Sequence, residues 1–132
     1  MAADQIALTM PADDAFQRVA HLVLGGLASR HELTVETLED LTLALDAVLE
    51  RYGDLEEDVT VRVQIGDDEI RTEIGPFHQA RVAADLSHEA GAELDLHRIL
   101  DAVCDDIAVA ERDGAKWVEL TKRVQRAEAE SA

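Results

Sequence analysis

Residues 59–74 read VTVRVQIGDDEIRTEI, and this stretch decides the fold. Apolar side chains alternate with polar ones on both sides of Gly66-Asp67-Asp68. The inward-facing set is Val59, Val61, Val63 and Ile65 before the turn, and Ile70, Thr72 and Ile74 after it. A period of two around such a turn predicts a β-hairpin, which we expect Gly75-Pro76 to end.

Two amphipathic helices are predicted before this hairpin. Apolar residues recur at spacings of three and four over residues 16–27 and again over residues 38–52. Asp13 or Asp14 is suited to cap the first helix, and Gly53 to end the second. Ahead of both helices, Ile6, Leu8 and Met10 alternate with small or polar neighbours, which predicts a short strand that ends at Pro11.

The second half of the chain adds one helix and another hairpin. Residues 77–91 lack a strong period and are predicted to form a loop or lid, with a short helical turn at residues 82–86. Helical spacing returns over residues 96–103, and residues 107–109 and 117–124 flank a turn at residues 112–115. Residues 1–124 are therefore predicted to form one domain, followed by a frayed tail at residues 125–132.

This order of elements predicts the fold class. The predicted order is a strand, two helices, two strands, a loop, a helix and two more strands. We expect an α+β protein, a two-layer sandwich in which helices pack on one face of a mixed, mostly antiparallel sheet.

The charge of the chain indicates which kinds of partner it favours, and its cysteine content indicates a cellular compartment. With 29 acidic residues against 12 basic ones, the net charge of -17 disfavours nucleic acids and anionic membranes and favours basic protein segments, unless it serves solubility alone. The lone Cys104 forms no internal disulfide, and no apolar run reaches the roughly 18 residues of a membrane span, so we expect a cytoplasmic protein. His78, His88 and His97 are too dispersed to predict a metal site.

Three stretches, in this order of elements, resemble a known family. They are IALTMPAD at residues 6–13, DLTLAL at 40–45 and WVELTKR at 117–123. Together they resemble the ATP-binding domain of histidine kinases, gyrase-type ATPases and bacterial anti-sigma factors that act as serine kinases. The resemblance spans roughly Ile6 to Val124 and implies a histidine-kinase-like ATPase fold.

The resemblance also implies where catalytic residues should lie. In that family, the helix that begins Asp-Leu carries a Glu that activates the attacking group and, four residues later, an Asn that holds magnesium. Counted from Asp40, these positions are Ala47 and Arg51, and neither side chain can do that chemistry. A slip of one residue offers Asp46 and Glu50 at the same spacing, as a substitute acidic pair or as a solvated helix face.

The nucleotide-binding motifs of the family are only partly matched. The adenine motif falls at residues 73–77, where Glu73 and Gly75 fit but Phe77 is bulky where backbone should approach the ligand; Phe77 packed in the core is the alternative. The phosphate loop falls at residues 91–96, where Gly91 fits. Glu93 and Asp95 replace glycines there, and would either repel a triphosphate or cap the next helix.

These departures favour a regulatory protein-binding domain that resembles an anti-sigma factor and has lost ATPase and kinase activity, with no cofactor. The implied partner is a sigma factor or an anti-sigma factor antagonist. The implied contact residues on the first two helices are Arg18, Glu32, Glu36 and Glu39. The alternative is a divergent ATP- and magnesium-dependent serine/threonine kinase that acts on such an antagonist. A structural half of a heterodimer, or a homodimer, also remains open.

Overall fold

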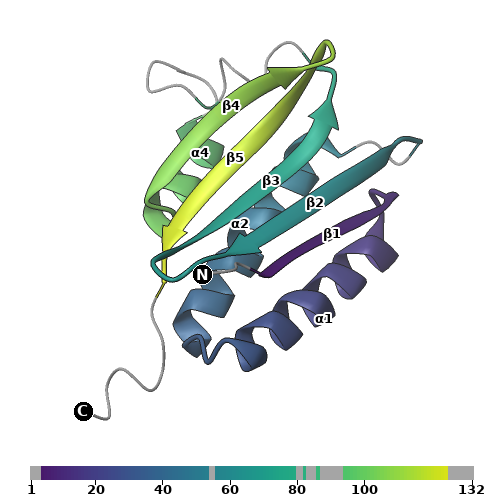
Figure 1. Ribbon diagram of the computed structural model, residues 1–132. Coiled ribbons are helices and arrows are strands. Elements are labelled where there is room, and N and C mark those ends of the chain that lie inside the picture. Colours follow the sequence, from purple (N-terminus) through teal and green to yellow (C-terminus); the bar gives the residue numbers. More distant parts are fainter. Residues whose placement is uncertain (1–3, 54–55, 80–81, 83–85, 87–93, 125–132) are drawn as a thin grey trace.

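The computed structural model describes residues 4–53, 56–79, 82, 86 and 94–124. The elements are β1 (Asp4–Pro11), α1 (Asp14–Arg30), α2 (Val35–Tyr52), β2 (Asp58–Ile65), β3 (Glu69–Phe77), α4 (Leu94–Val103), β4 (Asp106–Arg112) and β5 (Ala115–Arg123). They form two layers, with the three helices on one face of the sheet (Figure 1). The predicted α+β two-layer sandwich is confirmed.

The sheet has the strand order β1-β2-β3-β5-β4, and every neighbouring pair is antiparallel. Buried and exposed side chains alternate along β2, as the period of two predicted. The buried side chains face the helices. The opposite face of the sheet carries no helix in the described part of the chain (Figure 1).

The end of the first hairpin differs from the sequence-based prediction. Gly75-Pro76 does not end the strand, since β3 continues to Phe77 and pairs there with Lys116 of β5. The register shifts between Ile74 and Phe77. Such an irregularity accommodates a proline without a ladder hydrogen bond, which explains why the strand continues past it.

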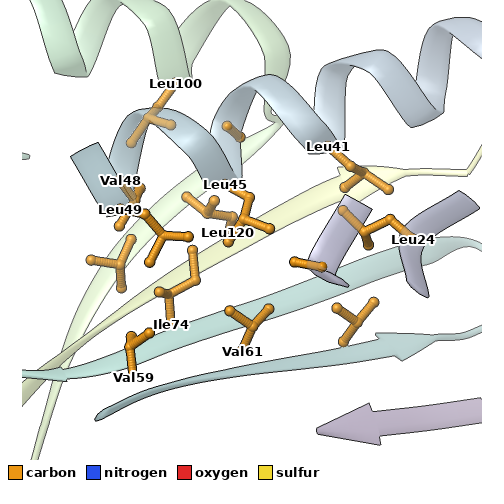
Figure 2. Close-up of a cluster of buried hydrophobic side chains, with 14 of the residues drawn as sticks. Leu24, Leu41, Leu45, Val48, Leu49, Val59, Val61, Ile74, Leu100 and Leu120 are labelled. Carbon is orange, nitrogen blue, oxygen red and sulfur yellow. The ribbon is translucent and has the colours of Figure 1, made fainter. Parts of the chain in front are cut away.

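The core lies between α2 and the sheet (Figure 2). Leu45, Val48 and Leu49 of α2 are buried against the inward side chains of β2, β3 and β5. Leu24 reaches the same core from α1 and Leu100 reaches it from α4. The apolar stripes predicted for the helices are therefore the surfaces that join the two layers.

Polar contacts fix the helix ends. The Asp13 carboxylate accepts a hydrogen bond from the Phe16 N–H at 3.0 Å, so Asp13 is the cap of α1. Gly53 follows the last residue of α2, as predicted. Lys122 of β5 lies 2.9 Å from the Asp40 carboxylate and donates to the Val103 carbonyl at 3.0 Å, which ties β5 to α2 and α4.

The segment between β3 and α4 is described only in part. Val82 and Leu86 are buried, and the Leu86 N–H donates to the Val82 carbonyl at 3.3 Å, in agreement with a helical turn at residues 82–86. The remainder of that prediction and the tail at residues 125–132 lie outside the described residues. Among the described helices, none is long and apolar enough to cross a membrane.

Gly25 and Gly26 lie in the middle of α1, where glycine disfavours a helix. A Cβ at Gly26 would meet nothing within 4 Å. We expect Gly26→Ala to raise the free energy of unfolding by about 0.5–1 kcal/mol, measured by urea denaturation. Gly114→Ala is the control and should lower it, because Gly114 has a φ of +79° in the β4–β5 turn. If Gly26→Ala lowered the free energy of unfolding instead, this part of α1 would not be helical.

Candidate functional site

Asp46 and Glu50, the substitute acidic pair, face different surroundings. Asp46 accepts a hydrogen bond from His21 Nε2 of α1, at 2.8 Å for Oδ1 and 3.1 Å for Oδ2. Glu50 is exposed and lines a hollow of about 270 Å³ with Asp13 and Asp14 at the start of α1. The two carboxylates therefore do not share a hollow where a magnesium ion and a phosphate would be held together.

Glu73 lies on the open face of the sheet, away from the helices. Its neighbours Thr72 and Ile74 are buried on the inward face, so the alternation of β3 turns Glu73 outward. The Glu73 carboxylate is 2.9 Å from Arg62 Nη1 and 3.3 Å from Arg112 Nη2. Arg112 also lies 2.6 Å from Glu119. Two guanidinium groups therefore occupy the oxygens that the adenine motif would need.

The Arg112 hydrogen bond, followed by that of Arg62, lowers the pKa of the Glu73 carboxyl below 4.5, although desolvation opposes the shift. A lowered pKa in the folded state stabilises the protein above the unfolded pKa, and that contribution is lost as the pH falls through the folded value. We expect Glu73→Gln to cost about 1 kcal/mol at pH 7 and progressively less at acid pH, in urea titrations at several pH values. Glu69→Gln is the matched control, because the Glu69 carboxylate is 3.9 Å from Arg71 Nε. This substitution should change the free energy of unfolding little. An unchanged pH profile in Glu73→Gln would contradict the role of this ion pair.

Gly75 lies beneath the ring of Trp117. A Cβ on Gly75 would stand 2.7 Å from Trp117 Cδ2, so only glycine allows the indole to rest on β3. The Arg62 and Arg112 guanidinium carbons lie 5.7 and 5.2 Å from the ring centroid. Gly75 therefore supports an arginine–tryptophan contact on the sheet. Gly91, the third residue of the predicted nucleotide pocket, lies outside the described residues.

A small hollow opens beside the end of β3. Its volume is about 250 Å³, and Tyr52, Glu57, Asp58 and Phe77 are among the residues that line it. The Tyr52 and Phe77 rings pack with centroids 5.5 Å apart, and both side chains are buried. Known small-molecule sites usually have volumes of about 300–1,000 Å³. The hollow is small, and its two carboxylates would repel a triphosphate.

A wider groove lies between α1 and α2 on the outer side of the helix layer. Its volume is about 430 Å³, and its walls are His21, Leu38, Glu39, Thr42, Leu43 and Asp46. Leu43 is 48% exposed, and Val35 at the start of α2 is 71% exposed. Leu22, the neighbour of His21 on α1, is 76% exposed. The sequence analysis did not identify these three side chains. Their positions outside the apolar stripe of each helix were the signal that could have found them.

One of the four predicted partner-contact residues lines this groove. Glu39 forms part of its wall, and Glu36 is exposed one turn earlier on α2. Glu32 is exposed between the helices, where it adopts a φ of 58°. Arg18 is also exposed, on α1. The contact between His21 and Asp46 lies between Arg18 and the three acids. Of the four predicted contact residues, the structure thus places Glu39 in the wall of the groove and Glu36 one helical turn from it, while Glu32 and Arg18 are not among the residues that line it.

Cys104, directly after α4, is half-buried. Burial raises the pKa of its thiol to about 11, with Asp105 adding to the shift against the opposing effect of Lys122. A thiol that stays protonated at neutral pH is a poor nucleophile, which agrees with a packing role.

Across the described ranges, no three His, Cys, Asp or Glu side chains are grouped so that they could hold a metal ion. Asp46 and Glu73, the carboxylates closest to the catalytic and adenine motifs, are engaged by His21 and by two arginines. No protein-family model and no curated protein sequence matches this chain.

Proposed function

We propose that this chain is a regulatory protein-binding domain of the cytoplasm that works without phosphate transfer, in the manner of an anti-sigma factor. The observation that carries the proposal is the open groove between α1 and α2, where the exposed Leu43 lies beside carboxylates. A sigma factor or an anti-sigma factor antagonist is the partner that the family resemblance suggests.

The exposed apolar side chains support a protein partner. Leu43, which lines the groove, is 48% exposed, and an exposed apolar side chain in a groove is typical of an interaction site. Leu22 and Val35 are further exposed apolar side chains on the same two helices. Other apolar residues of α1 and α2 form the buried stripes of the two helices, so core packing does not require apolar side chains at these three positions.

The acidic rim defines the chemistry of that partner. Glu36, Glu39 and Asp46 lie on or beside the groove of a chain with a net charge of -17. Such a field speeds encounter with a positively charged segment and repels acidic ones. We therefore propose that the bound segment is basic and presents apolar side chains to Leu43.

The altered nucleotide motifs support the loss of catalysis. Ala47 and Arg51 stand at the positions of the base and the magnesium ligand. Phe77 is packed on Tyr52, in the part of the adenine motif where the family needs space for the ligand. A protein scaffold that retains the fold but lacks these groups can still bind a partner.

Affinity capture with purified candidate partners tests this function. The wild type is expected to retain a sigma factor or antagonist stoichiometrically, and Leu43→Asp to lose it. The control is Ala108→Lys, which places a charge on the opposite face of the molecule. Binding that survives Leu43→Asp unchanged would contradict the groove as the contact surface.

Calorimetry with ATP and magnesium tests the second half of the proposal. No heat of binding is expected, and a dissociation constant below about 100 μM would contradict the loss of nucleotide binding. Phosphate transfer to an antagonist that Asp46→Ala and Glu50→Ala abolish would establish the kinase instead.

A further inference from the structure

The outer face of α2 carries a row of acidic side chains around one leucine. The buried residues of α2 face the sheet, and this row lies on the opposite side of the helix. We call it the α2 seam, and its residues are Glu36, Glu39, Leu43, Asp46 and Glu50. The Asp46 side chain is 27% exposed, and the other members of the seam are exposed.

The residues of the α2 seam recur at alternating spacings of three and four. This is the heptad spacing with which one helix packs along another at a crossing angle of about 20°. Each helical residue adds about 1.5 Å, so the seam is about 21 Å long from Glu36 to Glu50. The groove between α1 and α2 contains its three middle residues, and the seam continues beyond the groove at both ends.

The negative charge of the α2 seam is not balanced within the chain. Glu36 and Glu39 are three residues apart and Asp46 and Glu50 are four apart, and like charges at these spacings destabilise a helix. Within the described part of the chain, the one contact of a seam acid with a basic side chain is that of Asp46 with His21, at 2.8 Å. A partner that brings cations to this face therefore relieves a repulsion that α2 otherwise carries.

A helix fits the α2 seam better than a strand does. Two packed helices rise equally per residue, so their side chains stay in step along the whole seam. Side chains on one face of a strand are about 6.6 Å apart, so five of them span about 26 Å. A strand would therefore fall out of step with the seam by about 5 Å over its length.

From these observations we infer that the α2 seam binds an amphipathic helix of a partner protein. Lysine or arginine side chains of that helix face the acids, and an apolar side chain faces Leu43. The apolar residue lies at the centre, with two basic residues on each side at spacings of three and four. The inference rests on the protein-binding function proposed above, and it adds the conformation and the register of the bound segment.

Two designed peptides of identical composition test this register. The seam peptide is an alanine-based helix of about 20 residues, with a central leucine and two lysines on each side at spacings of three and four. In the control peptide the same lysines are spread around the helix. Fluorescence anisotropy of the labelled peptides measures binding, and we expect the seam peptide to bind at least about tenfold more tightly.

Charge reversal at the ends of the seam tests its length. Glu36→Lys combined with Glu50→Lys leaves the groove walls unchanged, and we expect it to weaken binding of the seam peptide at least about tenfold. Glu69→Lys combined with Asp106→Lys is the matched control, because it changes the net charge equally on the sheet face opposite the helices. It should bind within about twofold of the wild type. Circular dichroism checks folding, and Glu36→Gln with Glu50→Gln gives the same test, with a smaller loss, if the reversed variant does not fold.

Three results would overturn the inference. One is equal binding of the two peptides, because the register would then not matter. Another is no binding of the seam peptide up to about 1 mM. The third is wild-type affinity for the seam peptide after the end charges are reversed or removed. Capture of a protein partner with Leu43→Asp as the test variant is independent of these peptides, so a partner retained through the groove would then be bound in another conformation or register.

Discussion

Replacing Phe77 with alanine is expected to lower the free energy of unfolding by about 3–5 kcal/mol. Phe77 ends β3 with only 3% of its surface exposed, and its ring packs on that of Tyr52 at the end of α2. Alanine would remove this contact between the layers and leave a cavity that the backbone cannot close. Urea denaturation followed by circular dichroism measures the change.

Phe77→Leu is the matched control, because it keeps most of the apolar volume and should cost less than half as much. A loss below about 1 kcal/mol for Phe77→Ala would mean that the ring is not part of the core. ATP binding that appears only in Phe77→Ala would show that the aromatic side chain blocks a nucleotide site, which is the reading that the family motif suggests.

Much of the fold could be predicted because its signals are local. The apolar stripes over residues 16–27 and 38–52 predicted α1 and α2, and capping residues at Asp13 and Gly53 marked their ends. The period of two predicted both hairpins. The prediction that β3 ends at Gly75-Pro76 was wrong because it used only the local tendency of proline to end strands. Pairing with β5, through a shifted register, extends β3 to Phe77.

The candidate site was less predictable because it depends on contacts between distant segments. The direction of Glu73 was available from the sequence, since Thr72 and Ile74 had been assigned inward and the residue between them must face outward. Its arginine partners were not, because Arg112 lies 39 residues away and reaches Glu73 only through the β3–β5–β4 pairing. The groove depends in the same way on how α1 packs against α2.

Gly75→Ala is expected to destabilise the domain by about 1–3 kcal/mol, the usual cost of overpacking. The new Cβ would stand 2.7 Å from Trp117 Cδ2 and 3.0 Å from Trp117 Cγ, and these atoms belong to the rigid indole near its attachment to the backbone. The ring must therefore leave β3, and with it the contacts to Arg62 and Arg112. Tryptophan emission should shift to the red as the ring becomes exposed to water.

A double-mutant cycle separates this clash from other effects of alanine at position 75. In a Trp117→Ala background the indole is gone, so Gly75→Ala should cost almost nothing. Gly66→Ala is the control, because its Cβ would meet no atom closer than the Glu69 carbonyl oxygen at 3.6 Å. If Gly75→Ala costs the same with and without the indole, the glycine is needed by the backbone of β3 itself. A cost that vanishes with the indole means that Gly75 is glycine so that the Trp117 ring can lie flat on β3.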